Sequence, residues 1–499
     1  MHPVAVCSRG PGIKYDFLWV RETTLPRRPF VSGIRAGSSA LGFLSISSLN
    51  LGKFKAGSRR HCIPSATALS SSGMVENLVF DVVIVGAGII GLTIAREFLL
   101  ESDLSVAIVD AGIPCSGATG AGQGYIWMIH KTPGSDIWEL AARSKQLWEA
   151  LVKSIEHAGM DPLEILGWKK TGSLLIGRTP VELATLEQRV KLLSGAGVRA
   201  EFLSSTDLHL KEPELEVSEE SGAAFLLDDC QLDAHHTVAF IEKGNRSFAS
   251  HGRYAEFYHD PACCLIRSSQ NGEVQAVQTS KKILYSKKAV IVAAGAWTGL
   301  LMQNLVSQTD VSLDIPMKPR KGHLLILENF NHIQLNHGLM EAGYVDHQVT
   351  ASPPTSASGL IQHEHSLTSI SMTATSDMMG NVVLGSSRTF SGFNTETEES
   401  IILRIWERAG EFLPNLKNFS LLNLGSSRKV RVGLRPYMPD GKPIIGPIPG
   451  LPKVFLATGH EGGGLCMALG TAEMIADMVL GRTFKVDPAP FSVQGRCCR

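Results

Sequence analysis

The chain has 499 residues, of which 44% are hydrophobic and 19% charged, so it is long enough for two or three folded domains with a large core. Its 47 basic residues balance its 47 acidic residues, but residues 1–72 hold ten basic and only two acidic ones. Subtracting these from the totals leaves 37 basic and 45 acidic residues for the rest, and this mildly acidic body gives no reason to expect binding to nucleic acid or to membrane surfaces.

Residues 1–72 are basic, rich in serine and nearly free of acidic residues. They lack the charged start and apolar core of a secretory signal. This composition predicts a disordered organellar transit peptide, for a chloroplast rather than a mitochondrion. A disordered tail without a targeting role is the alternative.

The stretch Phe80–Asp110 predicts a dinucleotide-binding unit. The β-branched run Val82–Val85 is typical of a buried parallel strand, and it leads through a GAGIIG loop into a helical pattern. A second strand, Ser105–Val109, ends on Asp110, 19 residues after the last glycine of the loop. This is the order of a dinucleotide site, in which the glycines permit a tight turn and close packing, and the acid binds a ribose.

The same region is apolar enough over Val79–Leu100 to be read as a membrane span. Charged residues at its edges and three glycines inside it fit the dinucleotide unit instead. We therefore expect no transmembrane segment.

A glycine-rich loop, Cys115–Tyr125, follows Asp110 and should lie against a ligand, because its four glycines cannot fill a core. A helix comes next, with Asp136 at the N-cap, Glu139 at N3 and Gly159 at its end.

Residues of about 165–225 change character and begin a second domain, with a strand-like GSLLIG and a helix of about 180–194. From Asp233 the first domain resumes, with a helix over Ala234–Lys243 and a hairpin at Asn271-Gly272. The stretch Lys288–Trp297 then predicts a buried strand that ends on small residues, which can approach a bound dinucleotide.

Residues of about 311–430 predict strands of an antiparallel sheet and a helix over Thr397–Phe412. The aperiodic stretch Gln348–Ser369 is interpreted as a solvated insertion, with a mobile lid as the alternative.

A strand over Val454–Thr458, the loop GHEGGG and a helix ending at Leu480 recur near the C-terminus. The N–H groups of this loop and the positive end of the helix can hold negative charge. Glycine loops at both ends of the chain predict one long ligand, for which FAD is long enough. A nicotinamide nucleotide would not need the C-terminal loop.

Nine scattered cysteines, an odd number without CxxC spacing, argue against a disulfide framework, a zinc site and an iron–sulfur cluster. We expect no metal. Cys497 and Cys498 should lie in a frayed tail.

Five motifs together make the chain resemble the D-amino-acid oxidase superfamily of FAD-dependent oxidoreductases over about Asp81–Gly481. They are VVIVGAGIIGL with Asp110, SGATGAGQG, VIVAAGAWT, GLRPYMPDGKPIIG and LATGHEGGG. The superfamily includes glycine oxidase, sarcosine oxidase and bacterial dehydrogenases of D-amino acids and D-hydroxyproline. PRKGHLLILE with GNVVLGSSRTFSGF is most similar to the D-hydroxyproline and D-amino-acid dehydrogenase branch.

The resemblance implies an α/β fold with a discontinuous Rossmann-type FAD-binding domain and an antiparallel β-sheet substrate domain. The expected FAD-binding domain comprises residues 78–160, 231–310 and 430–483, and the substrate domain residues 161–230 and 311–429. Residues 484–499 form the expected C-terminal tail.

The resemblance implies non-covalent FAD, since no cysteine of the sarcosine oxidase type occurs in Leu434–Met438 and no flavin-linking histidine occurs near Ser116. It also implies which residues bind this FAD. The expected FAD-binding residues are Gly86, Ala87, Gly88, Ile89, Ile90, Gly91, Asp110, Ser116, Ala118, Thr119, Ala294, Gly295, Gly462, Gly463 and Gly464.

Arg435 matches the arginine that holds the substrate carboxylate in glycine and D-amino-acid oxidases. A guanidinium offers a planar fork for a carboxylate, although a structural salt bridge is the alternative role. His460 is a candidate general base, with a hydrogen-bonding spacer as the alternative. Tyr344 and Arg388 are further candidates for the substrate domain, without an assigned role.

The implied reaction is oxidation of the C–N bond of a small amino acid or secondary amine, of the D-amino acid, glycine/sarcosine or D-hydroxyproline type, by hydride transfer to flavin. Oxygen, a quinone or another flavoprotein would then accept the electrons. A catalytically silent flavin-fold scaffold in an organelle and an NAD(P)-dependent dehydrogenase are the alternatives.

Overall fold

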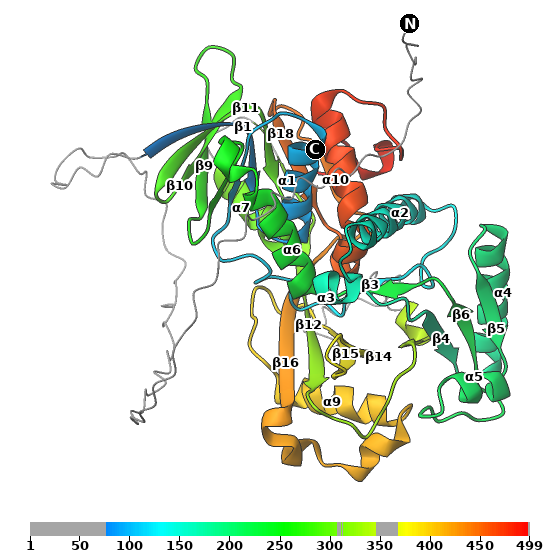
Figure 1. The fold of residues 1–499 in the computed structure, drawn as a ribbon. Helices are drawn as coiled ribbons and strands as arrows, with labels where there is room; N and C mark the ends of the chain where they lie inside the picture. Colours follow the sequence, from blue (N-terminus) through cyan, green and yellow to red (C-terminus); the bar gives the residue numbers. More distant parts are fainter. Residues whose placement is uncertain (1–75, 307–310, 312, 346–367, 498–499) are drawn as a thin grey trace, which may run out of the picture. The chain divides into compact units, whose positions relative to one another are not determined.

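A computed structural model of the protein describes residues 76–306, 311, 313–345 and 368–497. The predicted transit peptide, residues 1–72, and nearly all of the predicted insertion Gln348–Ser369 lie outside the described residues. The described residues form two eight-stranded sheets and one two-stranded sheet, with helices packed against the larger ones (Figure 1).

The first sheet is the predicted dinucleotide-binding sheet. Its strands are β1 (Glu76–Val85), β2 (Val106–Val109), β8 (Tyr254–Phe257), β9 (Ala262–Arg267), β10 (Val274–Thr279), β11 (Lys282–Val292), β17 (Ile444–Pro447) and β18 (Val454–Thr458). Strands β18, β11, β1, β2 and β8 pair in parallel, whereas β17, β10 and β9 add antiparallel neighbours. Three segments far apart in the sequence thus build one sheet, as predicted, and the hairpin at Asn271-Gly272 is confirmed.

Helices pack around this sheet. Helix α10 (Gly464–Leu480) packs against both α1 (Ile89–Glu101) and α2 (Asp136–His157), and α6 (Ala234–Arg246) packs on α1 (Figure 1). Among the described residues, Glu461–Leu480 is one helical segment long and apolar enough to cross a membrane, which the sequence analysis did not single out. However, 67% of its apolar window is buried within the protein, as expected for a core helix.

Two predictions about this domain were wrong. The N-cap of α2 is Ser135, whose Oγ accepts a hydrogen bond from Trp138 N, and Asp136 is the first helical residue. The C-terminal residues are not frayed up to Cys497, because Phe491 and Val493 are fully buried and Arg496 pairs with Asp440. Val493 and Cys497, so near the chain end, are buried because they belong to the apolar core of the first sheet.

The second sheet is the predicted substrate sheet. In spatial order its strands are β16 (Arg428–Tyr437), β12 (Lys318–Leu327), β15 (Val382–Arg388), β14 (Ser369–Ser376), β13 (Gly338–Glu341), β4 (Ser173–Gly177), β6 (Gly222–Leu226) and β5 (Ala200–Leu203). All neighbours pair antiparallel except β13 and β4, which are parallel. The sheet is therefore mixed rather than purely antiparallel, because the chain crosses between its two halves.

Helices also cover this second sheet. Helix α9 (Glu399–Gly410) packs on β12, β14 and β15, and α4 (Pro180–Gly195) and α5 (Ser205–Lys211) pack beside β5 and β6. The buried face of α9, with Ile402 and Trp406, joins Leu325 and Leu384 in one apolar core.

Two predicted domain boundaries do not follow the sheets. Strand β16 was assigned to the FAD-binding domain from residue 430, but it pairs along its whole length with β12 of the second sheet (Figure 1). Helix α3 (Pro162–Leu166) was assigned to the substrate domain, but it packs against α6. The correction for β16 matters most, because it places the predicted substrate arginine, Arg435, in the second sheet and not in the FAD-binding domain.

Candidate active site

One cavity of about 750 Å³ joins the N-terminal and C-terminal glycine loops. Its wall includes Gly86 and Gly88 after β1 and His460, Gly462 and Gly464 after β18. A volume of this size is typical of a cofactor or small-ligand site. The two loops that the sequence analysis placed on one ligand therefore do share one cavity.

The loop after β1 has the backbone of a dinucleotide-binding turn. Gly86 has a φ of +119°, and a Cβ there would lie 2.4 Å from the carbonyl oxygen of Ala293. A Cβ on Gly91 would lie 1.9 Å from the Gly86 oxygen, so helix α1 can pack against the turn only with glycine at this position. Gly88 caps α1 without any side-chain hydrogen bond to the helix, which leaves the positive end of the helix directed at the cavity.

Asp110 stands at the end of β2, on the wall of the same cavity. Its carboxylate accepts hydrogen bonds from Ala87 N at 2.6 Å and from Gly112 N at 2.7 Å. These bonds fix the acid beside the first glycine loop, where its remaining acceptor capacity suits ribose hydroxyls.

The loop over Cys115–Tyr125 covers the N-terminus of α1. Thr119 Oγ1 accepts a hydrogen bond from Ile89 N at 3.2 Å, and Ser116 Oγ donates one to Ile113 O at 2.7 Å. Ser116, Ala118 and Thr119, which were predicted to bind FAD, all line the cavity.

The C-terminal loop forms the opposite wall. Gly463 caps α10 without a side-chain hydrogen bond, and the small residues Ala294 and Gly295 after β11 line the cavity nearby. The N-termini of α1 and α10 thus both lie at one cavity, and Asp110 lies beside the first of them. These features fit a long dinucleotide such as FAD.

Three predicted FAD-binding residues do not line the cavity themselves. Ala87 acts through its N–H group on Asp110, Gly91 provides room for the turn, and Gly463 lies against Met467. The residues placed in the wall are Gly86, Gly88, Ile89, Ile90, Asp110, Ser116, Ala118, Thr119, Ala294, Gly295, Gly462, Gly464, Arg435 and His460.

His460 is buried and neutral. Its Nε2 lies 2.9 Å from Thr471 Oγ1 on α10, and burial lowers the pKa of the imidazole to about 3. A base that binds a proton so weakly contributes little proton transfer near neutral pH. These features favour the hydrogen-bonding spacer over the general base.

Arg435 reaches the cavity from β16, which pairs with β12 so that Gly322 lies opposite Gly433. A Cβ on Gly322 would lie 2.5 Å from the guanidinium carbon and from both terminal nitrogens of Arg435, so glycine leaves the room that this group fills. Among the described residues, its one hydrogen bond runs from Nη1 to Ser387 O at 2.9 Å. Donor capacity therefore remains for a ligand.

The sequence analysis missed further charged groups around Arg435. Glu461 lines the cavity, and Arg320 Nη1 lies 3.4 Å from its Oε1. Arg388, named without a role, is buried with its guanidinium carbon 4.0 Å from the ring centroid of Tyr344, which also lines the cavity. The sequence signal for Glu461 was its place inside the GHEGGG motif, whereas Arg320 gave none, because only the pairing of β12 with β16 brings it to this site.

Two further polar residues that the sequence analysis missed are Gln123 and Tyr125. Both line the cavity, and Tyr125 donates a hydrogen bond to Gln123 Oε1. Thr373 Oγ1 on β14 donates to the same oxygen at 2.9 Å. This chain of hydrogen bonds connects the loop over Cys115–Tyr125 to the second sheet.

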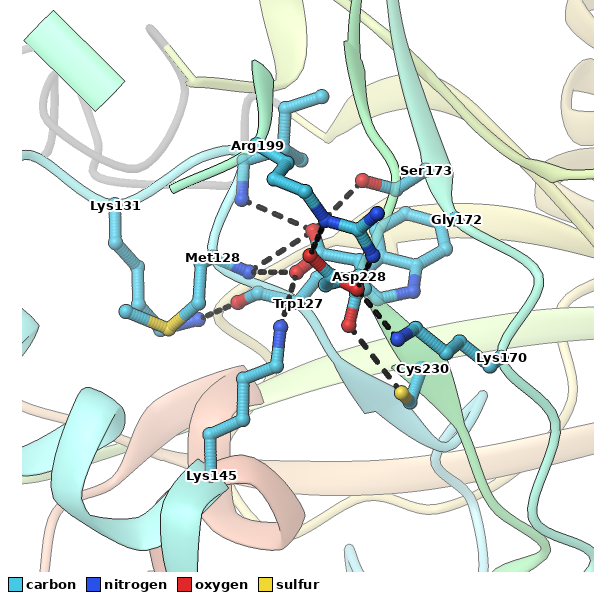
Figure 2. Close-up of polar contacts among 12 residues, drawn as sticks. Trp127, Met128, Lys131, Lys145, Lys170, Gly172, Ser173, Arg199, Asp228 and Cys230 are labelled. Atoms are coloured by element: carbon cyan, nitrogen blue, oxygen red, sulfur yellow. Dashed lines mark hydrogen bonds and ion pairs between the residues drawn. The ribbon is translucent and has the colours of Figure 1, made fainter. Parts of the chain in front are cut away.

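A buried carboxylate holds the segment after Tyr125 in place. Asp229 is fully buried and accepts hydrogen bonds from Met128 N at 2.9 Å, Ile129 N at 3.2 Å and Ser173 Oγ at 2.7 Å. Its partners Met128, Ser173 and Lys145 are labelled in Figure 2. Lys145 on α2 pairs with it at 3.2 Å. Burial alone would lower the pKa of Lys145, but the adjacent Asp229 raises it above its ordinary value.

The Asp229 cluster links α2, over the first sheet, to β4 of the second. The segment that it holds continues from β3 (Tyr125–Ile126), which pairs with β7 (Cys230–Gln231). Tyr125 stacks on Trp127 with ring centroids 3.9 Å apart. The cluster therefore positions one wall of the cavity without lining it.

Among the described residues, no group of three or more His, Cys, Asp or Glu side chains is arranged to hold a metal ion. The described cysteines are Cys115, Cys230, Cys263, Cys264, Cys466 and Cys497, and all six are free.

Comparison with known proteins gives a family and several relatives. The family described as "FAD dependent oxidoreductase" matches residues 81–478. Glycine oxidase of Pseudomonas aeruginosa is 26% identical over 435 residues, which cover 83% of this chain and 99% of that protein. The crystal structure of glycine oxidase from Geobacillus kaustophilus matches with a TM-score of 0.67 at 21% identity, covering 84% of this chain and 99% of the other. Iminodiacetate oxidase from Chelativorans sp. BNC1 matches with a TM-score of 0.65 at 20% identity, covering 82% and 98%.

Proposed function

The chain belongs to the FAD-dependent oxidoreductases of the D-amino-acid oxidase superfamily, and from this premise we propose that it oxidises the C–N bond of a small amino acid or secondary amine at Arg435. FAD is the cofactor of this family, so the NAD(P)-dependent alternative is set aside. The protein is an FAD-dependent amino-acid or amine oxidoreductase, which leaves no reason to retain the silent scaffold.

One observation carries the proposal: the cavity that joins the two glycine loops is also lined by Arg435. A planar guanidinium binds a carboxylate through two parallel hydrogen bonds and so fixes its orientation. The names of two relatives, glycine oxidase and iminodiacetate oxidase, state substrates that carry both an amine and a carboxylate.

The residues that would hold FAD divide into two groups. Asp110 and the turn at Gly86–Gly91 would bind the ADP half, and Gly462 and Gly464 at the start of α10 would face the flavin half. When bound, FAD supplies the acceptor for the two electrons that leave the C–N unit of the substrate. The positive end of α10 favours negative charge that develops on this side of the cavity.

The substrate-binding residues act by orientation. Arg435 would hold the carboxylate, and Gly322 and Ser387 in turn hold Arg435. Such orientation is a large part of catalysis when the chemistry itself belongs to the cofactor. His460 would keep the C-terminal loop on α10 through Thr471.

The first test is anaerobic mixing of the holoprotein with a panel of glycine, N-methylglycine, D-amino acids and cyclic secondary amino acids. We expect at least one member to bleach the visible absorbance of the flavin. If no member bleaches a flavin that dithionite does reduce, the proposal fails. Reoxidation by air, a quinone or an electron-transfer flavoprotein then identifies the acceptor.

The second test is Arg435→Ala with Arg431→Ala as its control, since Arg431 lies on the same strand outside this cavity. We expect Arg435→Ala to raise the KM of the substrate on the order of 100-fold, because two charge-assisted hydrogen bonds are lost, with FAD retained. Arg431→Ala should keep both properties. Loss of FAD in Arg435→Ala alone would show that Arg435 binds the cofactor instead.

We also propose, from composition alone, that residues 1–72 direct the protein to a chloroplast. A fluorescent protein fused behind residues 1–75 should enter plastids in plant cells. Accumulation in mitochondria or in the cytosol would contradict this.

A further inference from the structure

Two half-exposed aromatic rings stack on each other beside the cavity. Trp297 belongs to the short helix η2 (Gly295–Trp297), which follows β11 of the first sheet, and Phe393 lies in the loop between β15 of the second sheet and α9. Their ring centroids are 6.1 Å apart, with an angle of 30° between the rings. Trp297 is 39% exposed and Phe393 is 43% exposed, so the pair lies at the surface. This stack therefore connects the two sheets outside their cores.

Trp297 is also part of the cavity wall. A Cβ on Gly117, another residue of the wall, would lie 3.7 Å from Trp297 Cζ3, which is an ordinary contact distance. Thr119 of the same loop accepts a hydrogen bond from Ile89 N at the N-terminus of α1, where the pyrophosphate of FAD is expected. An FAD bound along this wall would therefore lie against Trp297.

Hydrogen bonds hold the backbone before Trp297 in place. Gly295 O accepts hydrogen bonds from Thr298 Oγ1 at 2.8 Å and from Thr458 Oγ1, at the end of β18, at 3.1 Å. The indole ring can therefore leave Phe393 by rotation of its own side chain or by movement of the loop that carries Phe393.

A buried lysine holds the loop that carries Phe393. Lys321 on β12 is fully buried, and its Nζ donates hydrogen bonds to Asn394 Oδ1 at 3.2 Å and to Glu398 Oε1 at 2.8 Å. Asn394 directly follows Phe393, and the next residue, Thr395, lines the cavity. The ammonium group thus fixes the loop where it reaches the cavity from the side of the second sheet.

We propose that Trp297 and Phe393 form a clasp that must open before FAD can enter or leave the cavity. The proposal concerns the cofactor and does not depend on which substrate is oxidised. The clasp consists of protein side chains alone, so it opposes entry and exit of FAD to the same extent. Aromatic pairs of this kind change an equilibrium constant by a factor of about two to ten, so removal of the clasp should accelerate both steps by about this factor.

Phe393→Ala is the informative variant, because Phe393 is not among the described residues of the wall and reaches FAD only through Trp297. The rate of FAD release is measured from the rise of flavin fluorescence after dilution of the holoprotein. The Kd of FAD is measured at equilibrium over a dilution series. We expect release to become about two- to tenfold faster, with the Kd within about twofold of wild type, because a barrier to both directions leaves the equilibrium unchanged.

Two variants serve as controls. Phe393→Tyr keeps the ring and should release FAD at the wild-type rate. Phe390→Ala removes an equally exposed ring from the same loop, but Phe390 packs on Tyr437, with ring centroids 5.2 Å apart. It should change neither the release rate nor the Kd. In a protein that already carries Trp297→Ala, Phe393→Ala should accelerate release no further, because its partner ring is gone.

Four outcomes overturn the inference. The first is an unchanged release rate in Phe393→Ala. The second is faster release with an equally weaker Kd, which shows that Phe393 stabilises bound FAD and does not control its passage. The third is an equal acceleration in Phe390→Ala or Phe393→Tyr, which indicates a general loosening of the loop. The fourth is a further acceleration by Phe393→Ala in the absence of the Trp297 ring.

Discussion

Asp229→Asn tests how the two sheets are held together at the cavity. The carboxylate is fully buried and accepts hydrogen bonds from Met128 N, Ile129 N and Ser173 Oγ. An amide in its place turns one acceptor into a donor that faces backbone N–H groups. It also leaves the Lys145 ammonium, 11% exposed, without the anion that it pairs with.

Breaking one partner of a buried ion pair costs about 3–5 kcal/mol. For a folded body of about 420 residues, the unfolding entropy near the melting temperature makes this a loss of about 3–6 °C in Tm. Thermal unfolding of the holoprotein, followed by circular dichroism, measures it. Tyr125 lines the cavity and stacks on Trp127, in the segment that Asp229 holds. We therefore also expect the flavin spectrum of Asp229→Asn to respond more weakly to bound carboxylates than that of wild type.

The neighbouring Asp228→Asn is the matched control. Figure 2 shows Asp228 between Arg199 and Lys170. Asp228 pairs with Arg199 and with Lys170, the latter at 2.5 Å, but the side chains of these partners are 62% and 53% exposed. Exposed ion pairs contribute about 0–1 kcal/mol, so Tm should fall by about 1 °C or less. The reasoning is refuted if Asp229→Asn melts within about 1 °C of wild type, or if both variants lose the same amount.

Two further predictions concern the first sheet. Gly91→Ala should yield protein without bound FAD, because the new Cβ would lie 1.9 Å from the Gly86 oxygen. The control Gly195→Ala, with nothing within 4 Å of its Cβ, should retain FAD. The ratio of flavin absorbance to protein absorbance measures this, and equal ratios in the two variants would contradict the prediction. Glu97→Gln should stabilise the protein in a pH-dependent way, because burial, helped by Glu101, Glu473 and Asp477, raises the pKa of Glu97 from 4.5 to about 7. The folded state then binds more protons than the unfolded state between these values, so stability falls as pH rises from about 4.5 to 7 and stays reduced above it. After a discount for partial exposure, the variant should gain about 1–2 kcal/mol at about pH 8 and nothing near pH 4, and an equal gain at both values would argue against the proton linkage.

The parts predicted best from the sequence are those in which local chemistry fixes the backbone. Gly86 and Gly91 are required by contacts of their own turn, and Asp110 follows from the length of one strand–helix–strand unit. The position of the C-terminal loop at the cavity was predicted for a similar reason. Its glycines precede a helix that begins at Gly464, and this residue lines the cavity.

The parts predicted worst depend on contacts between distant segments. Nothing within Arg428–Tyr437 shows that it pairs with Lys318–Leu327 rather than with the strands that follow it. Likewise, Val493 looks like part of a tail until the core to which it belongs is known.

The charged groups of the site were missed for the same reason. Arg320 and Arg388 belong to different strands of the second sheet and converge on Glu461 only through its register. The position of Glu461 inside a glycine motif can be read from the sequence. Its charged surroundings cannot, because they depend on the guanidinium groups that the second sheet places beside it.

The most direct test of the account is a crystal structure of the holoprotein with isobutyrate bound. The account predicts one FAD that extends from Asp110 and the N-terminus of α1 to the loop at Gly462–Gly464, with the isobutyrate carboxylate on Arg435. An FAD that does not reach the C-terminal loop, or a carboxylate bound away from Arg435, would contradict it.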